Sequence, residues 1–243
     1  MARLLYVCVR PQEGAAAAEY ESFRSGAHLD PAELDRIDLV RERLPDDAAE
    51  RWDGYFIGGS PFNVTDPESA KTEPQRALEA DLERIARWAA DGAVSALFTC
   101  FGIGIVTRML GGVVSRAYPE DTGPVTVSLT SVGERDALFG GLATRFAAFT
   151  AHKEGAGEVP PGAVLLATND ACPVQAYSVG EHLYATQFHP EPTGQAFTER
   201  MAVYRDDGYF DSRDYDAIAA RVRAASVSEP TRLLRAFSRR VTG

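Results

Sequence analysis

The chain has 243 residues, of which 45% are hydrophobic and 25% are charged, a composition typical of a globular protein that buries a sizeable core. Lysine and arginine number 25 against 35 aspartates and glutamates, which gives a formal net charge of -10. Such a charge repels polyanions, so nucleic acid is excluded as an expected partner. The apolar run near the amino terminus is too short for a signal peptide or a membrane span, and we expect no membrane partner.

Short apolar runs and helical patterns alternate in the first half of the chain. Runs at 4–9, 55–57 and 93–99 predict buried strands, and a weaker run at 37–40 predicts another. Helical patterns cover 12–27, 72–91 and 103–110. Because strands alternate with helices, we expect a mainly parallel sheet with crossover connections.

The second half of the chain changes character. Four stretches with alternating apolar residues predict further strands, some of them antiparallel, at 125–130, 163–167, 174–177 and 183–188. The chain turns helical again from Thr193. The last helical stretch, 231–240, carries an apolar stripe of Leu233, Leu234 and Phe237 opposite a basic face. We interpret it as a helix docked on the body of the protein and favour this over a membrane-surface helix.

The three cysteines lie far apart and form no CxxC pair. This spacing predicts no disulfide framework and fits a reducing, cytoplasmic environment. We interpret Cys8 and Cys172 as core thiols. The histidine, cysteine and acidic residues have no metal-ligand spacing, and no nucleotide-binding motif is present, so we expect neither a metal nor a cofactor.

The segment 93–104 places Cys100 where a strand gives way to a helix. A sharp turn there would expose the sulfur at the sheet edge, and the positive amino-terminal end of the helix would favour the reactive thiolate. Gly102 would relieve crowding between the helix and the strand. The alternative interpretation is a buried cysteine that only fills space in the core.

A second segment supplies a base for this thiol. The run Gln187-Phe188-His189-Pro190-Glu191 ends a strand with a histidine and places a carboxylate two residues later. In an extended backbone the side chains of His189 and Glu191 lie on the same side. Glu191 would therefore orient one ring nitrogen while the other faces the thiol, as a cysteine nucleophile requires.

Together these segments resemble the class I, or triad, glutamine amidotransferases. The matching motifs are Cys100-Phe101-Gly102, the His189-Pro190-Glu191 segment and the glycine loop Gly58-Gly59-Ser60-Pro61, and the resemblance covers about residues 1–210. It implies an α/β, flavodoxin-like fold with a mainly parallel central sheet flanked by helices and additional antiparallel strands. We expect residues 1–243 to form a single domain, with a carboxy-terminal helical extension over about 210–243.

The resemblance also implies roles for individual residues. Cys100 would attack a side-chain amide and form a thioester, His189 would shuttle protons, and Glu191 would hold the imidazole. The remaining roles are an oxyanion hole made by the amides of Gly59 and Phe101, and substrate binding by Gly58, Gly102 and Gly104. Such a hydrolase acts on glutamine or a γ-glutamyl compound, as in the glutaminase unit of GMP synthase or in γ-glutamyl peptidases.

Two positions depart from the family pattern. The family usually has glycine at the position of Phe98 and glutamine at the position of Gly104, where the glutamine side chain helps to hold the substrate. These departures keep two alternatives open: a γ-glutamyl peptidase, and a catalytically weak regulatory or binding module. A separate ammonia-accepting synthase and a homodimer also remain open as partners. His152 lies where relatives often have a histidine near the pocket, but we favour a loop position for it.

Overall fold

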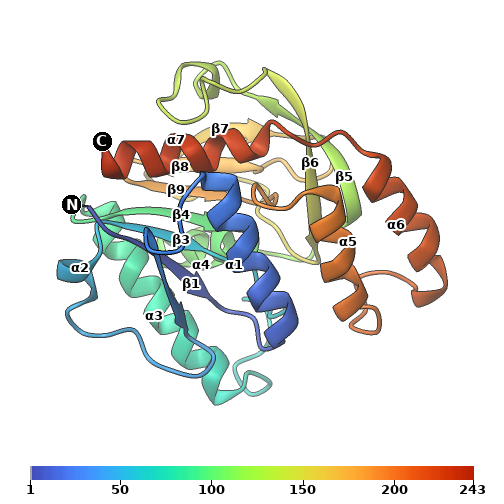
Figure 1. The fold of residues 1–243 in the computed structure, drawn as a ribbon, viewed down its shortest axis with the longest axis horizontal. Coiled ribbons are helices and arrows are strands. Elements are labelled where there is room, and N and C mark those ends of the chain that lie inside the picture. The colour runs from blue at the N-terminus through green and yellow to red at the C-terminus, as the bar shows by residue number, and fades with distance from the viewer. Residues whose placement is uncertain (1) are drawn as a thin grey trace.

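The computed structural model describes residues 2–243, and these residues contain one nine-stranded sheet (Figure 1). The strands in chain order are β1 Leu4–Cys8, β2 Leu34–Asp38, β3 Gly54–Ile57, β4 Ser95–Thr99, β5 Glu120–Leu129, β6 Arg145–His152, β7 Val164–Thr168, β8 Ala176–Val179 and β9 Leu183–Thr186. Their order in the sheet is β2-β1-β3-β4-β9-β8-β7-β5-β6. The pairings from β2 to β9 are parallel, and those from β9 to β6 are antiparallel. The predicted α/β class, with a parallel core and added antiparallel strands, is confirmed.

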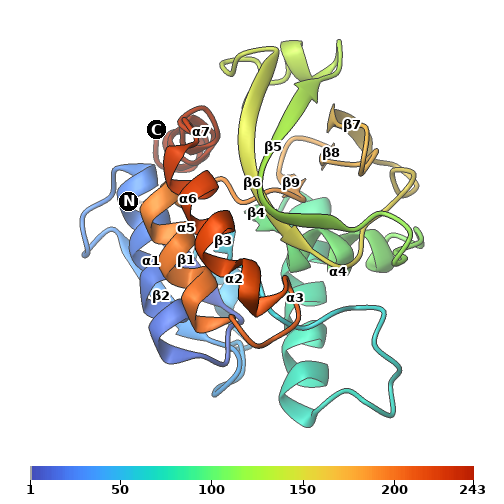
Figure 2. The same ribbon diagram turned by 90° about the vertical axis from the view of Figure 1, so that its right-hand side faces the viewer.

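Helices lie on both sides of the parallel strands (Figure 2). They are α1 Glu13–Ala27, α2 Ala48–Arg51, α3 Glu73–Ala90, α4 Phe101–Met109, α5 Gly194–Val203, α6 Tyr215–Ala224 and α7 Pro230–Thr242. The helices α1, α5, α6 and α7 lie on one side, and α3 and α4 lie on the other. In residues 2–243 no helix combines the length and apolar character needed to span a bilayer.

The central strands are apolar throughout because both of their faces are covered. On β1, Leu5 and Val7 belong to the core beneath α3 and α4, whereas Leu4 and Tyr6 belong to the core beneath α1 and α7. Successive side chains of a strand point to opposite faces, so a strand between two helical layers needs apolar residues at every position. This explains the continuous apolar runs in the sequence.

The terminal helix α7 docks on the body of the protein, as its apolar stripe predicts. Leu233, Leu234 and Phe237 are buried, and the Phe237 ring lies 5.0 Å from that of Phe56 on β3. α7 runs beside α1 (Figure 1). At this contact, a β-carbon added to Gly26 would lie 2.8 Å from Leu234 Cδ1.

Several predicted boundaries are wrong. The second strand lies at Leu34–Asp38 rather than at 37–40, because as an edge strand it buries only Leu34 and Ile37 and carries Asp35 and Arg36 between them. The edge strand Arg145–His152 has no counterpart in the predicted elements, since its alanine-rich pattern is a weak strand signal. Helix α4 starts at Phe101, immediately after Cys100, and not at 103.

Candidate active site

Three neighbouring parallel strands bring the predicted site residues to one edge of the sheet. β3 pairs with β4, and β4 pairs with β9 in a register that sets Thr99 opposite Thr186. The chain leaves these strands as the Gly58-Gly59 loop, as Cys100 and as the segment leading to His189. Because the carboxyl ends of parallel strands meet at one edge, segments far apart in the sequence converge here.

Cys100 occupies a strained turn between β4 and α4. Its φ of 52° and ψ of -105° lie in a region that non-glycine residues rarely adopt. The turn is held by hydrogen bonds from the Cys100 N–H to the Thr186 carbonyl (2.8 Å) and from the Ile103 N–H to the Cys100 carbonyl (3.1 Å). Cys100 is 7% exposed. It lies between the last residue of β4 and the first residue of α4, and therefore next to the first amides of that helix.

Phe98 does not block this turn. Its side chain is completely buried in the core beneath α3 and α4. A β-carbon added to Gly102 would lie 3.0 Å from both Cβ and Cδ1 of Phe98. The absence of a side chain at Gly102 therefore makes room for the phenylalanine that replaces the usual glycine.

His189 and Glu191 form the pair that their spacing predicts. The His189 N–H donates to the Phe149 carbonyl (2.9 Å), which ties the residue to β6. Its Nδ1 lies 3.0 Å from Glu191 Oε1, and His189 and Cys100 line the same pocket. Both residues are buried. The structure thus brings Cys100, His189 and Glu191 together in the predicted order.

The charges of this group stabilise one another. Burial lowers the pKa of His189, but the Glu191 carboxylate and then Cys100 outweigh it and raise that pKa to about 9. Burial likewise opposes ionisation of Glu191, yet His189 and Arg200 hold the pKa of its carboxyl far below the ordinary value. An imidazolium beside an ionised carboxylate is therefore the favoured state at neutral pH.

A buried ionic network, which the sequence analysis missed, lies behind the imidazole. Arg200 Nη1 lies 2.7 Å from Glu191 Oε1 and 3.3 Å from Glu19 Oε1, and Arg10 Nη2 lies 2.8 Å from Glu19 Oε1. All four side chains are at least 95% buried. The sequence did contain a sign that Glu19 is buried. It lies four residues after Ala15 and four before Phe23, and this spacing places it on the buried face of α1. A carboxylate there requires a buried cation.

The predicted oxyanion-hole residues differ in their surroundings. The Gly59 N–H donates to Glu19 Oε1 at 3.3 Å, and a β-carbon on Gly59 would lie 2.8 Å from His189 Cε1. Phe101 is the first residue of α4, so its amide is one of those without an intrahelical acceptor. Gly58 packs against Glu19, where an added β-carbon would clash with the carboxylate. Their roles in catalysis and substrate binding stay predictions.

Two pockets meet at the Cys100 sulfur. The first, the helix-side pocket, is lined by Phe101, Ile103 and Gly104 at the start of α4, by residues of the 60–63 loop and by residues 151–156. Of the three predicted substrate-binding glycines, only Gly104 lines it. A β-carbon on Gly104 would lie 3.0 Å from Val64 Cγ2 and 3.7 Å from Glu154 Oε1. These two side chains therefore fill the space where the family has its glutamine side chain.

The second pocket, the histidine-side pocket, lies on the other side of the sulfur. It is lined by Cys100 and His189, by two arginines and by a mostly aromatic wall. The arginines are Arg10 and Arg200, and the wall includes Phe197, Met201, Tyr204 and Phe210. Ser60, Cys100, Ala151 and Tyr209 line both pockets. Cys100 therefore borders two pockets, and the two pockets differ in chemistry.

His152 is not the loop residue that we favoured. It ends β6, is buried and lines the helix-side pocket, because the antiparallel β5–β6 pairing draws it opposite Glu120. Its Nε2 lies 2.7 Å from Glu120 Oε2, and its Nδ1 lies 2.8 Å from the Glu154 carbonyl oxygen. Burial opposes ionisation of Glu120, but His152 holds the pKa of its carboxyl below the ordinary value.

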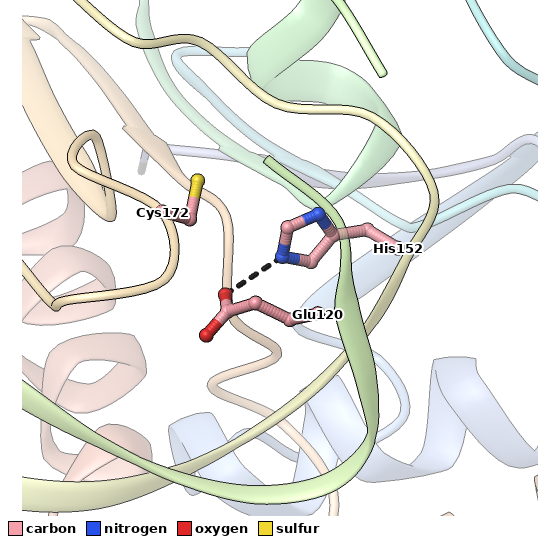
Figure 3. A group of neighbouring side chains, drawn as sticks. All are labelled: Glu120, His152 and Cys172. Carbon is pink, nitrogen blue, oxygen red and sulfur yellow. Dashed lines mark hydrogen bonds and ion pairs between the residues drawn. The ribbon is translucent and has the colours of Figure 1, made fainter. Parts of the chain in front are cut away.

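Cys172 completes a cluster with these two residues (Figure 3). The ligand atoms of Glu120, His152 and Cys172 lie within 4.8 Å of one another, a spacing that could hold a metal ion. However, Glu120 and His152 already pair directly, and the Cys172 thiol donates to the Val174 carbonyl. Burial raises the pKa of Cys172 to about 12. We therefore interpret the cluster as a structural support behind the helix-side pocket.

The chain is similar to known proteins over most of its length. Residues 21–203 match the family model described as glutamine amidotransferase class-I. The chain is 30% identical over 160 residues to a GMP synthase (glutamine-hydrolysing) from Xanthomonas axonopodis, which covers 62% of this chain and 28% of that protein. It is 28% identical over 165 residues to γ-glutamyl peptidase 3 of Arabidopsis thaliana, covering 65% and 62%. The chain thus matches about a quarter of the synthase and less than two thirds of the peptidase.

Solved structures share the fold. A glutamine amidotransferase from Thermotoga maritima superimposes with a TM-score of 0.76 at 17% identity, covering 99% of this chain and 97% of that one. A putative GMP synthase subunit from Thermoplasma acidophilum gives 0.56 at 22% identity, covering 85% and 97%. At such identities the likeness concerns the fold alone, and it confirms the predicted flavodoxin-like architecture.

Proposed function

The chain belongs to the class I glutamine amidotransferase family, and on that premise we propose that it hydrolyses the side-chain amide of glutamine or of a γ-glutamyl compound. Cys100 is the nucleophile, His189 the proton carrier and Glu191 the residue that orients the imidazole. The observation that carries the proposal is that buried Cys100 and His189 line one pocket beyond the carboxyl ends of β4 and β9, while Glu191 pairs with His189.

The proposed reaction is a series of proton transfers between His189, the substrate and water, with Cys100 as the nucleophile. The Cys100 thiolate attacks the γ-carbonyl carbon, the C–N bond breaks, and the His189 imidazolium gives its proton to the departing nitrogen. Water then gives a proton to His189 and attacks the thioester, which releases the γ-carboxylate and restores the thiol. Glu191 keeps the ring oriented and balances its charge in both steps.

Two amides are proposed to stabilise the oxyanion of each tetrahedral intermediate. The Phe101 N–H is available at the start of α4, whereas the Gly59 N–H has to leave Glu19 before it can serve. A preorganised donor of this kind contributes on the order of 3 kcal/mol in acyl-transfer enzymes. The cost of breaking one hydrogen bond at Gly59, about 1 kcal/mol, is small enough for the intermediate to overcome.

A γ-glutamyl peptidase is the second candidate, and Gly104 favours it. Val64 and Glu154 occupy the space of the family's glutamine side chain, so free glutamine loses one of its usual contacts. Peptidase activity also needs no ammonia acceptor. If the protein is instead a transferase, we propose a separate synthase partner, with residues 1–243 forming one domain that acts in the cytoplasm.

The test is product release over a panel of amides. Glutamine, asparagine and γ-glutamyl peptides are incubated with the protein, while intact mass reports an acyl adduct on Cys100. We expect turnover of γ-glutamyl substrates and its complete loss in Cys100→Ala, whereas the control Cys8→Ala retains it. Turnover that survives Cys100→Ala would overturn the proposal. Lack of both turnover and adduct would favour the regulatory module.

A further inference from the structure

We propose that the histidine-side pocket is a leaving-group subsite that takes an amino acid with an apolar or aromatic side chain, joined through its amino group to a γ-glutamyl unit. The inference rests on the proposed function and deepens it. Free glutamine, whose leaving group is only ammonia, leaves this subsite empty. The substrate class is therefore a γ-glutamyl dipeptide or a longer γ-glutamyl peptide.

The position of His189 assigns the two pockets to the two halves of the substrate. A general acid has to reach the departing nitrogen, and His189 lines the histidine-side pocket but not the helix-side pocket. Phe101, whose amide is proposed for the oxyanion hole, lines the helix-side pocket but not the histidine-side pocket. The acyl half accordingly lies in the helix-side pocket, and the leaving amine lies next to His189.

The walls of the leaving-group subsite fit more than ammonia. Phe197, Met201 and Phe210 give it an apolar surface, and the rings of Tyr204 and Tyr209 add an aromatic one. Phe197 is fixed by stacking on Phe149 at 4.8 Å, so this wall is preorganised. Apolar and aromatic walls bind apolar and aromatic side chains by excluding water.

The two arginines favour a carboxylate on the leaving group. Arg10 and Arg200 line the subsite, whereas the carboxylates that balance them, Glu19 and Glu191, do not. The buried nitrogens Arg10 Nε, Arg200 Nε and Arg200 Nη2 have no hydrogen-bond partner within residues 2–243. A guanidinium with unused donors matches the planar carboxylate of an amino acid.

The chemistry stays balanced with such a leaving group. Cys100 sulfur bonds to the γ-carbonyl carbon as the bond from that carbon to the amino-acid nitrogen breaks. The His189 proton passes to this nitrogen, so the amino acid leaves as a neutral amine that takes up a further proton in water. Hydrolysis of the thioester then releases glutamate, with no co-reactant other than water.

Substrate pairs test the subsite directly. We compare kcat/KM of the whole protein for glutamine, γ-glutamyl-phenylalanine and γ-glutamyl-phenethylamine, which lacks the carboxylate. We expect γ-glutamyl-phenylalanine to exceed glutamine by about 100-fold and the carboxylate-free analogue by about 10-fold. Equal values for glutamine and γ-glutamyl-phenylalanine would overturn the subsite, and equal values for the two aromatic substrates would overturn the carboxylate assignment.

A variant in the subsite wall provides the second test. Phe210→Ala is expected to lower the ratio of kcat/KM for γ-glutamyl-phenylalanine over glutamine by about 10-fold. Val203→Ala, at an exposed position of α5 outside both pockets, is the control and should leave the ratio unchanged. A ratio measured on one preparation does not depend on how much of it is folded. An unchanged ratio in Phe210→Ala would contradict the inference.

These outcomes separate the inference from the proposed function. Glutamine turnover without a preference for γ-glutamyl-phenylalanine overturns the leaving-group subsite and leaves the proposed function intact. A lack of turnover on every substrate, together with an unmodified Cys100, overturns both.

Discussion

Arg200 Nη1 donates to Glu191 Oε1 over 2.7 Å, the same carboxylate oxygen that accepts from His189 Nδ1. Arg200 therefore has two effects on the proposed triad. It fixes the carboxylate that orients the imidazole, and its guanidinium pairs with both Glu19 and Glu191, two carboxylates that otherwise repel each other. The pair thus links the buried charges of the core to the reactivity of the thiol.

Replacing Arg200 by methionine should destabilise the protein in a pH-dependent way. Burial of an unbalanced charge costs about 3 kcal/mol of the free energy of unfolding. Burial raises the pKa of Glu19 and of Glu191, but Arg200 is among the charges that hold both below their ordinary value of 4.5. The stability from such depressed carboxyls is present above pH 4.5 and is lost as the pH falls.

Urea denaturation at pH 7 and pH 4 tests the direction of this pH dependence. The deficit of Arg200→Met relative to wild type should be full at pH 7 and smaller at pH 4. The control Arg223→Met removes an exposed arginine of α6 and should change stability by less than about 0.5 kcal/mol. A deficit that grows on acidification would contradict the role assigned to Arg200.

Replacing Glu191 by glutamine should lower the pKa of His189. Burial alone lowers that pKa, and Glu191 is the largest of the influences that raise it to about 9. Without the carboxylate, the pKa of His189 should fall, because burial still opposes the charged ring and its largest opposing influence is gone. An NMR titration of the histidine ring protons measures the shift, with His189→Asn identifying the signal.

The same change should slow hydrolysis by about 100-fold or more, because the carboxylate no longer orients the imidazole or balances its charge. Glu199→Gln, at an exposed position of α5, is the matched control. A His189 pKa near 9 in Glu191→Gln would show that another group sets it.

Iodoacetamide at neutral pH should modify Cys100 before the other two cysteines. Cys100 lines both pockets and lies beside the His189 imidazolium, whereas Cys8 and Cys172 are completely buried. Burial raises the pKa of both of these thiols, which keeps them protonated and slow. Peptide mapping by mass spectrometry gives the order of labelling. Modification of Cys8 or Cys172 ahead of Cys100 would refute this prediction.

Gly102→Ala should destabilise the elbow between β4 and α4. The new methyl group would lie 3.0 Å from two carbons of the buried Phe98 side chain, and overpacking of this kind costs about 1 to 3 kcal/mol. Gly14→Ala is the control, since Gly14 is an exposed helical residue with nothing within 4 Å of an added β-carbon, and it should gain about 0.5 kcal/mol. Urea denaturation of both variants provides the comparison, and equal stabilities would be the contrary result.

The sequence was sufficient for the class of fold and for the three residues of the proposed triad. Continuous apolar runs identify strands covered on both faces, and this holds for β1, β3 and β4. Cys100, His189 and Glu191 lie in two short segments that follow the ends of β4 and β9. The topology of a parallel sheet brings such strand ends together. Weak patterns failed where strands lie at the sheet edge, as in β2 and β6.

Only the tertiary structure decided what surrounds the triad. Arg10, Glu19 and Arg200 come from three separate elements, and nothing local in the sequence links them. The same applies to His152, which the β5–β6 pairing sets opposite Glu120, and to Val64 and Glu154, which fill the space above Gly104. The physical reason is that the periodicity of each strand and helix, and their succession along the chain, are properties of local sequence. Charge pairing and pocket shape instead depend on which side chains the completed packing brings into contact.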